Sequence, residues 1–357
     1  MKNYFSDIKD IVDSKYIEWD NFNNKSILIT GASGMIGRCI TDLLMCANKE
    51  LKLSIKVYVL VRNKEKAEKL FAEYFENNLF QIIVGDVCDK NLSQKIIKYM
   101  SDINNKDNYL HIDYIIHAAG YGDPAAFVSD PVGVMMSNLT GTINMLELTK
   151  KYNGRMVFIS TGEVYGYTGK REAYHEEDAG VLDFNKVRSC YPESKRAAET
   201  LCHSYNEQYQ TDVSICRPCH IYGQTMTERD SRVIAQFIRN AVKKEDIVMK
   251  SEGSQIRSMC YVADAAHAIL VVLCKGRKGE TYNVSNTESS ITIKEMAEIL
   301  TSAAGTRLVI ELPSGYEKKG YSVSDYQVLD DKKIKALGWS ALTEVSVGLT
   351  KVVEDLS

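Results

Sequence analysis

The nine residues ITGASGMIG (29–37) decide the fold class of this chain. They follow the apolar run SILIT (26–30), which is typical of a buried strand. Apolar side chains at helical spacing come next: Ile36, Ile40, Leu43, Leu44 and Ala47. The glycines therefore lie in a turn that joins a strand to a helix, as in an alternating β/α chain.

The glycines of this turn, Gly31, Gly34 and Gly37, indicate an anion-binding site. Glycine can take a positive φ, and the missing side chain lets the backbone approach a pyrophosphate. The following helix adds free N–H groups and a partial positive charge at its N-terminus. The spacing is G-x-x-G-x-x-G, not the commoner G-x-G-x-x-G. We predict that the turn binds a dinucleotide through these glycines and through Ser33, Met35 and Ile36.

Further strand candidates follow, and helical segments separate them. They are IKVYVLV (55–61), FQIIV (80–84), DYIIH (113–117), RMVFIS (155–160) and TDVSICR (211–217). Strands that alternate with helices form a parallel sheet with helices on both faces. We therefore expect an α/β fold with a doubly wound, Rossmann-type parallel sheet.

Residues 1–24 precede the first strand and predict a helical extension packed on the sheet. The apolar side chains near helical spacing are Phe5, Ile8, Val12 and Tyr16. We expect this helix to have a structural role.

The composition excludes several classes of protein. The chain has 357 residues with 44 basic and 47 acidic side chains, which gives no general field for nucleic acid. Its nine cysteines have no repeated spacing, which favours reduced thiols in a cytosol over a disulfide framework. Asp7 interrupts the N-terminal segment, and the longest apolar run, 265–274, is too short to span a bilayer. We expect a cytoplasmic protein that binds neither nucleic acid, membrane nor metal.

The stretch CRPCH (216–220) allows three interpretations: a haem attachment site, a thiol redox pair or the end of a strand. Covalent haem attachment requires export, for which the N-terminal segment carries no signal. The redox pair and the strand end stay open on this stretch alone.

Two short segments fit a dinucleotide across the strand ends. Asp86 and Val87 belong to GDV (85–87), where the Asp86 carboxylate could accept a hydrogen bond from an adenine amino group. A simple turn aspartate is an equal alternative. In HAAG (117–120), the small residues Ala118, Ala119 and Gly120 leave room for a cofactor at the switch point of the sheet.

Tyr191 and Lys195 lie four residues apart in YPESK (191–195), so they share one face of a helix. A free tyrosine has a pKa near ~10, and a neighbouring ammonium lowers it. Thr161, in STGEVYG (160–166), could orient an alcohol and share its proton. These three groups predict proton removal from an alcohol whose carbon gives hydride to a nicotinamide.

The chain resembles the extended short-chain dehydrogenases/reductases, which include nucleotide-sugar epimerases, dehydratases and decarboxylases. The resemblance covers roughly residues 25–357. It rests on GASGMIG, GDV, HAAG, NLTGTINMLE, STGEVYG, YPESKRAAE, RPCHIYG, GSQIRSMCYVAD and YNVSN in this order. It implies an NAD(P)-binding domain over 25–217, to which 258–285 returns. It also implies a smaller C-terminal lobe, 218–257 and 286–357, for a UDP-, CDP- or dTDP-linked sugar, and a homodimer.

The resemblance also implies roles for individual residues. Thr161, Tyr191 and Lys195 would form the catalytic triad, and Glu163 would also be catalytic. Tyr191 and Lys195 would contact the cofactor as well, and Asn138 would be structural. Arg257 would contact the nucleotide diphosphate, which suits the fork of a guanidinium. The nucleotide pocket would be lined by Ser231, Arg232 and Val233.

RPCHIYG (217–223) occupies the place of the family's strand-end segment R-x-x-N-x-Y-G-P, which lies near the sugar. Cys216 would then be a core thiol, and Cys219 would lie near the substrate. His220 replaces the usual Asn and Gln224 the usual Pro. His220 either contacts the substrate or is structural.

Gly162 and Glu163 bear on the reaction, since dehydratases of the family usually carry an Asp-Glu pair there, and simple epimerases usually lack the Glu. The Thr-x-Glu arrangement followed by RSCYPESKRAAE looks most like the UDP-glucuronate decarboxylases. Arg188 would hold the uronate carboxylate, or it would stabilise a loop. The alternatives are a 4-epimerase, an NADPH-dependent reductase of a nucleotide-linked sugar and a non-catalytic nucleotide-binding protein.

Arg62 leaves the choice of cofactor open. NAD enzymes usually carry an acid after the second strand, for the ribose 2′-OH. Arg62 stands there instead, in VRNKEKAEK, and suits the 2′-phosphate of NADP. Family chemistry that recycles its own hydride favours NAD.

Overall fold

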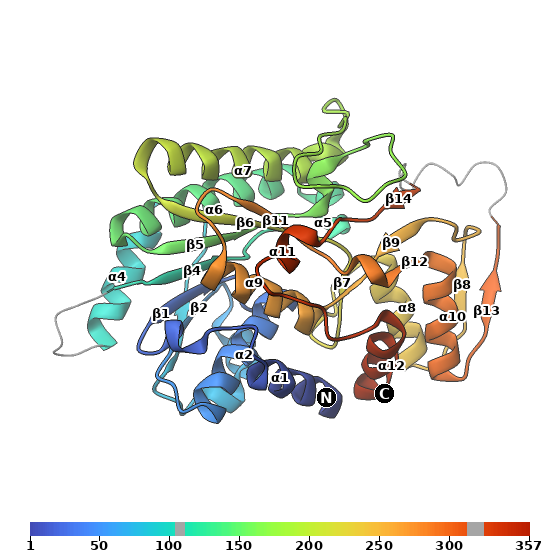
Figure 1. Cartoon of the computed structure of the whole chain (residues 1–357), viewed down its shortest axis with the longest axis horizontal. Helices are drawn as coiled ribbons and strands as arrows, with labels where there is room; N and C mark the ends of the chain where they lie inside the picture. Colours follow the sequence, from blue (N-terminus) through green and yellow to red (C-terminus); the bar gives the residue numbers. More distant parts are fainter. Residues whose placement is uncertain (104–110, 313–324) are drawn as a thin grey trace.

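A seven-stranded parallel sheet forms the centre of the computed structural model, which describes residues 1–103, 111–312 and 325–357 (Figure 1). The strand order is β11-β6-β5-β4-β1-β2-β3. The strands are β1 (Ser26–Thr30), β2 (Lys56–Val61), β3 (Phe80–Val84), β4 (Tyr114–His117), β5 (Arg155–Ile159), β6 (Asp212–Pro218) and β11 (Thr281–Val284). The expected doubly wound α/β fold is confirmed.

Both faces of this sheet are buried, which explains the continuous apolar runs of its strands. Ile27 and Ile29 of β1 pack into one hydrophobic core, whereas Leu28 packs into another on the opposite face. The first core includes helices α1 (Lys2–Asp13), α2 (Met35–Glu50) and α9 (Val262–Lys275). The second includes α4 (Leu92–Ile103), α6 (Pro131–Tyr152) and α7 (Cys190–Tyr209).

The C-terminal part of the chain forms smaller sheets beside the large one (Figure 1). Their strands are β7 (Ile221–Tyr222), β8 (Ile247–Met249), β9 (Ile256–Ser258), β10 (Cys260–Tyr261), β12 (Ser290–Thr292), β13 (Leu308–Ile310) and β14 (Tyr326–Gln327). They pair as β12-β9-β14, β13-β8 and β10-β7. β11 returns to the large sheet beside β6. The expected domain boundaries stay predictions.

The remaining helices are short or belong to the C-terminal part. The α-helices are α3 (Lys64–Leu70), α5 (Pro124–Ser129), α8 (Val233–Val242), α10 (Ile293–Ala304), α11 (Lys332–Lys335) and α12 (Val345–Leu356). The 3₁₀ turns are η1 (Trp19–Phe22), η2 (Ala72–Tyr74), η3 (Gly162–Tyr165), η4 (Val187–Ser189) and η5 (Thr287–Ser289). Across the described ranges, no helix is long and apolar enough to cross a membrane.

The N-terminal segment forms α1, with a buried stripe that differs from the expected one. Ile8 and Val12 are buried as expected, but Tyr4 takes the place of Phe5, which is 41% exposed. Tyr4 and Ile8 are four residues apart and share a helix face, whereas residue 5 lies a further 100° around the helix. Tyr16 lies beyond the end of α1 and packs on His267.

Candidate active site

The glycine turn packs tightly between β1, α2 and the end of β4. Gly31 has φ +68°, and a Cβ there would lie 2.5 Å from the carbonyl oxygen of Ala118. A Cβ on Gly37 would lie 2.5 Å from the carbonyl oxygen of Gly31. Gly34 is the N-cap of α2, so the first N–H groups of this helix, from Met35 on, have no carbonyl partner within the helix. The turn can therefore donate hydrogen bonds to an anion.

The backbone at the end of β4 also packs closely against neighbouring groups. The N–H of Ala119 donates to Thr30 Oγ1 at 3.1 Å. A Cβ on Gly120 would lie 2.6 Å from Asn138 Oδ1 and 3.4 Å from Lys195 Nζ. Asn138 Oδ1 is buried and has no hydrogen-bond partner among the described residues. The glycine turn, the small residues and this polar atom fit a dinucleotide that lies across the strand ends.

Tyr191, Lys195 and Thr161 come together at the carboxyl end of β5. Thr161 is the N-cap of η3, directly after the strand, and its hydroxyl hydrogen-bonds to that of Tyr191. Lys195 lies one turn after Tyr191 on the buried face of α7. Its Nζ donates to the carbonyl of Ile159 at 2.8 Å.

The electrostatics of Tyr191 differ from the expectation that Lys195 lowers its pKa. Burial raises the pKa of Tyr191 to about 12, and the carboxylate of Glu163 adds to this rise. The Thr161 hydrogen bond and the charges of Arg232 and Arg188 act in the opposite direction. The expectation considered only the neighbouring charge, whereas the folded chain also removes the phenol from water.

Burial also lowers the pKa of Lys195 to about 8, because the charged form loses its hydration.

Glu163 and Arg188 form an ion pair beside this triad. Arg188 Nη2 lies 2.8 Å from Glu163 Oε2. The Arg188 guanidinium also lies 4.7 Å from the ring centre of Phe127. The ring of Tyr191 stacks on the same Phe127, with centroids 4.5 Å apart. A carboxylate, a guanidinium and two aromatic rings thus form one cluster at the edge of the site.

The residues expected to contact the substrate approach the triad from the C-terminal part. His220 Nε2 lies 3.2 Å from Gln327 Oε1, and the Gln327 amide donates to the carbonyl of Gly162 at 3.4 Å. Burial and the charges of Arg257 and Arg232 lower the pKa of His220 to about 3, so its imidazole is neutral.

The two arginines of this group differ in their surroundings. Arg257 is buried in β9. Arg232, the N-cap of α8, binds the Asp230 carboxylate and the carbonyl of Ile221. Val233 begins α8 and is 51% exposed. Ser231 hydrogen-bonds to Asp123 through its hydroxyl.

Arg62 lies apart from the triad, at the end of β2. Its Nη1 donates to the hydroxyl of Tyr121 at 2.7 Å, and its guanidinium lies 5.2 Å from the centre of that ring. The Asp86 carboxylate accepts the N–H of Cys88 at 2.8 Å, as a turn aspartate does. Val87, beside it, is buried. Tyr121 packs on the Phe127 cluster and so connects Arg62 to the neighbourhood of the triad.

CRPCH is a strand end in the folded chain. Cys216 lies on β6 with its side chain buried in the core, and Cys219 is a free, buried thiol. A Cβ on Gly162 would lie 3.0 Å from Cys219 Sγ. Cys219 therefore packs behind the segment that carries Thr161 and Glu163.

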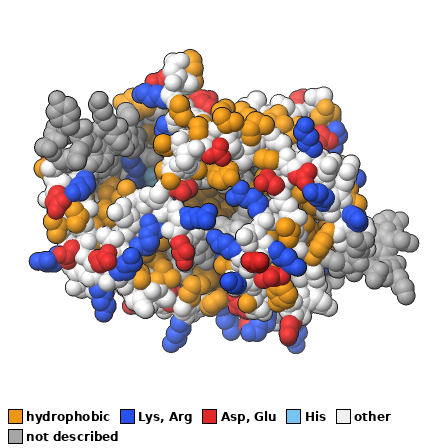
Figure 2. Space-filling view, turned by 180° about the vertical axis from the view of Figure 1, so that it is seen from behind, with side chains coloured by type: hydrophobic (Ala, Val, Ile, Leu, Met, Phe, Trp, Pro, Cys, Tyr) orange, Lys and Arg blue, Asp and Glu red, His pale blue; other side chains and the backbone are white. Residues whose placement is uncertain are grey.

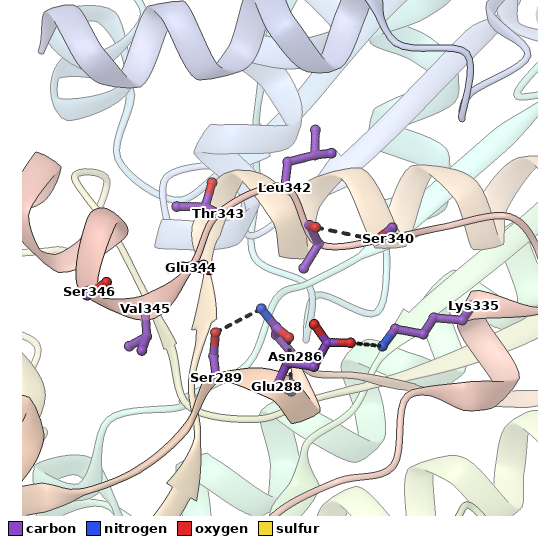
Figure 3. Close-up of a pocket in the computed structure, with 11 residues that line it drawn as sticks. Asn286, Glu288, Ser289, Lys335, Ser340, Leu342, Thr343, Glu344, Val345 and Ser346 are labelled. Atoms are coloured by element: carbon purple, nitrogen blue, oxygen red, sulfur yellow. Dashed lines mark hydrogen bonds and ion pairs between the residues drawn. The ribbon is translucent and has the colours of Figure 1, made fainter.

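The surface view shows a hollow near the middle of one face, with Lys and Arg side chains around it (Figure 2). A separate cavity of about 460 Å³ lies between η5 and residues 340–346. Glu288 and Lys335 form an ion pair in its wall, and Asn286 hydrogen-bonds to Ser289 (Figure 3). None of the residues expected for the catalytic site lines this cavity.

The NAD dependent epimerase/dehydratase family matches the chain over residues 27–285. The chain belongs to this family. UDP-glucuronic acid decarboxylase 1 of Danio rerio is 30% identical over 339 residues, which cover 94% of this chain and 73% of the relative. UDP-glucuronic acid decarboxylase 3 of Arabidopsis thaliana is 29% identical over 339 residues, which cover 93% of this chain and 89% of the relative.

Solved structures share the fold of this epimerase/dehydratase-family protein. dTDP-glucose 4,6-dehydratase from Bacillus anthracis, in complex with NAD, has a TM-score of 0.74 at 22% identity and covers 92% of this chain and 96% of its own. UDP-glucose 4-epimerase from Thermotoga maritima, with UDP-glucose, has a TM-score of 0.76 at 21% identity. The match covers 92% of this chain and 97% of the epimerase. Together the comparisons support modification of a nucleotide sugar as the general activity.

The motifs of the epimerase/dehydratase family did not indicate Tyr121, Phe127 or Gln327. Phe127 lies 64 positions before Tyr191, on which it stacks, and Gln327 lies 107 positions after His220. No local pattern marks these residues, because their contacts are made only by the folded chain.

Proposed function

We propose that this protein is an NAD(P)-dependent decarboxylase of a nucleotide-linked uronate, with UDP-glucuronate as its substrate. The observation that carries the proposal is the Glu163–Arg188 ion pair, 2.8 Å long, in one cluster with Tyr191. The identity to UDP-glucuronic acid decarboxylases supports it.

Arg188 supplies the cation that a uronate requires, because burying a carboxylate without a partner costs several kcal/mol. The guanidinium is half-exposed and already pairs with the Glu163 carboxylate, so it can exchange one carboxylate for another. The guanidinium lies over the ring of Phe127, which also stacks on Tyr191 and so keeps the two groups side by side.

The triad performs the proton transfers. Tyr191 takes the proton of the sugar C4 hydroxyl, while Thr161 hydrogen-bonds at the same oxygen. The charge of Lys195 favours the phenolate that this step requires. The C4 ketone lies β to the C6 carboxylate, so the electron pair of the C5–C6 bond moves into an enolate as CO2 leaves. A proton from solvent then adds at C5, and Tyr191 returns its proton to the C4 oxygen.

The glycine turn, Ala118, Ala119 and Gly120 would hold the dinucleotide. Bound there, it would supply a hydride acceptor for C4 and return the hydride after decarboxylation, and the charge of its oxidised nicotinamide would also favour the Tyr191 phenolate. His220, Arg232 and Arg257 would contact the nucleotide part of the substrate.

The test is the mass of the product. With UDP-glucuronate and the dinucleotide, we expect a product lighter by one CO2 and no net change in nicotinamide absorbance after the first turnover. A product lighter by one water, or an isomer of unchanged mass, would contradict the proposal.

A second candidate is an NADPH-dependent reductase of a nucleotide-linked sugar. Arg62, at the end of β2 where an acid is usual in NAD enzymes, favours it. Stoichiometric consumption of NADPH would select this activity over decarboxylation.

We also propose a homodimer that buries α5 and the start of α6. Large apolar side chains are exposed along these helices: Val128 at 79%, Val132 at 71%, Met136 at 52% and Ile143 at 38%. A row of such side chains on one surface is typical of an interface.

A further inference from the structure

Glu199 and Arg217 form a buried ion pair one helical turn beyond Lys195, and the triad chemistry assigns them no role. We propose that Glu199, held by Arg217, is a positioning residue that keeps the Lys195 side chain charged at neutral pH. It would thereby set the high-pH limit of the enzyme. The enzymatic part of this inference rests on the proposed function.

Lys195 and Glu199 share the buried face of α7. They are four residues apart, and their residues are 4% and 6% exposed. The Lys195 ammonium is satisfied only in part by the carbonyl of Ile159, at 2.8 Å, and by the ring face of Phe158, 4.7 Å from its centre. Both are neutral groups, so a buried cation here requires an opposite charge nearby.

Arg217 holds the Glu199 carboxylate in place. Its Nε and Nη2 donate to the two carboxylate oxygens at 3.0 and 2.7 Å, which is a bidentate pair. Its Nη1 donates to the hydroxyl of Tyr165 and to the carbonyl of Glu176. Arg217, on β6, thus uses four of its five N–H donors in these hydrogen bonds and leaves little freedom to the carboxylate.

Among the residues that the structure describes, four titratable groups lie around Lys195. On α7 these are Tyr191, Glu199 and Cys202, and on β4 it is His117. Burial lowers the pKa of His117 to about 3, so its imidazole is neutral, and burial raises the pKa of the Cys202 thiol. Burial raises the pKa of Tyr191 to about 12, so the phenol is neutral too. Glu199 is thus the carboxylate among the four, and it forms the ion pair with Arg217.

This arrangement decides in which direction the loss of the Glu199 carboxylate would move the pKa of Lys195. Burial lowers the pKa of Lys195 to about 8, and Glu199 is the first group that opposes the fall. Without the carboxylate, the ammonium would lose its proton at a lower pH. The phenolate of Tyr191 would then lose its neighbouring positive charge near neutral pH, and turnover would fall.

The experiment measures the titration of Lys195 itself. Protein labelled with ¹³C at the lysine ε-carbon is titrated by NMR, and the Lys195 resonance is assigned by its loss in Lys195→Arg. In Glu199→Gln the midpoint should fall by at least ~0.5 pH unit, because the carboxylate that opposes the effect of burial is gone. In Glu199→Asp, which keeps the charge, the midpoint should return most of the way to its wild-type value. Glu207→Gln, an exposed glutamate on the same helix, should leave the midpoint unchanged.

The pH profile of kcat/KM with UDP-glucuronate should follow the NMR result, with the high-pH limb of Glu199→Gln displaced in the same direction. An unchanged Lys195 midpoint in a folded Glu199→Gln protein would overturn the inference. If that variant does not fold, Glu199→Asp, which draws the carboxylate back from the ammonium by one methylene, is titrated instead, with a smaller fall in the same direction expected. If the wild type does not convert UDP-glucuronate, the proposed function fails, whereas the NMR titration still decides on Glu199.

Discussion

Arg188 donates to Glu163 at 2.8 and 3.1 Å, so two residues expected to act on the substrate bind each other in the folded chain. They lie 25 positions apart, one in η3 and the other in η4. A uronate that enters must compete with Glu163 for the guanidinium. Such competition makes the site sensitive to the charge of its ligand, because a neutral sugar gains nothing from breaking the pair.

This pair predicts a substrate-dependent effect of Arg188→Ala. KM for UDP-glucuronate should rise at least ~10-fold, because the carboxylate loses its charged partner. Binding of UDP alone, measured by calorimetry, should change little. Lys186→Ala removes a nearby exposed cation and is the control. Equal losses for UDP-glucuronate and UDP would mean that Arg188 only stabilises its loop.

Tyr191→Phe tests the catalytic base. Turnover should fall at least ~100-fold because no group remains to take the alcohol proton. Dinucleotide affinity should stay nearly unchanged in calorimetry. Tyr209→Phe, at the exposed end of the same helix, should keep full turnover. A Tyr191→Phe enzyme with wild-type turnover would refute the assignment.

Arg62→Ala tests the choice of cofactor. If the guanidinium binds a 2′-phosphate, NADP binding should weaken by ~1–3 kcal/mol, whereas NAD binding should stay the same. Calorimetry with both cofactors measures the difference. Lys64→Ala, an exposed cation two residues later, is the matched control. Equal loss of both affinities would assign Arg62 to the packing of Tyr121 instead.

Gly162→Ala tests the packing behind the triad. The new Cβ would lie 3.0 Å from Cys219 Sγ and 3.2 Å from Leu329 Cδ1, so we expect ~1–3 kcal/mol of destabilisation from overpacking. Cys219→Ala in the same chain should restore part of the loss, and urea unfolding of the four proteins of the cycle measures the coupling. Purely additive effects of the two substitutions would show that the thiol does not close this space.

The proposed dimer predicts a change of mass. Val132→Asp combined with Met136→Asp places two charges on the exposed face of α6 and should convert a dimer into a monomer in light scattering. Val347→Asp, on the exposed face of α12, should not change the mass. A wild-type monomer would rule out the interface.

Patterns along the chain were sufficient for six of the seven strands of the large sheet and for the glycine turn, whereas β11 was not predicted as a strand. The strands at 26–30 and 80–84 have the predicted bounds, because continuous apolar runs and alternation with helices are local signals. Gly31 takes the positive φ expected of it. The four-residue spacing of Tyr191 and Lys195 is a property of one helix, and so it could be predicted without the tertiary structure.

Only the tertiary structure decided which side chains come into contact at the site. Phe127, Gln327 and Arg217 reach the site from distant parts of the chain, and no spacing in the sequence relates them to Tyr191, His220 or Glu199. The pKa of Tyr191 was predicted in the wrong direction because desolvation depends on the whole surrounding structure, whereas the spacing to Lys195 reports one charge. The sequence determined the elements and the residue types at their ends, and three-dimensional packing determined the partners, burial and charge of those residues.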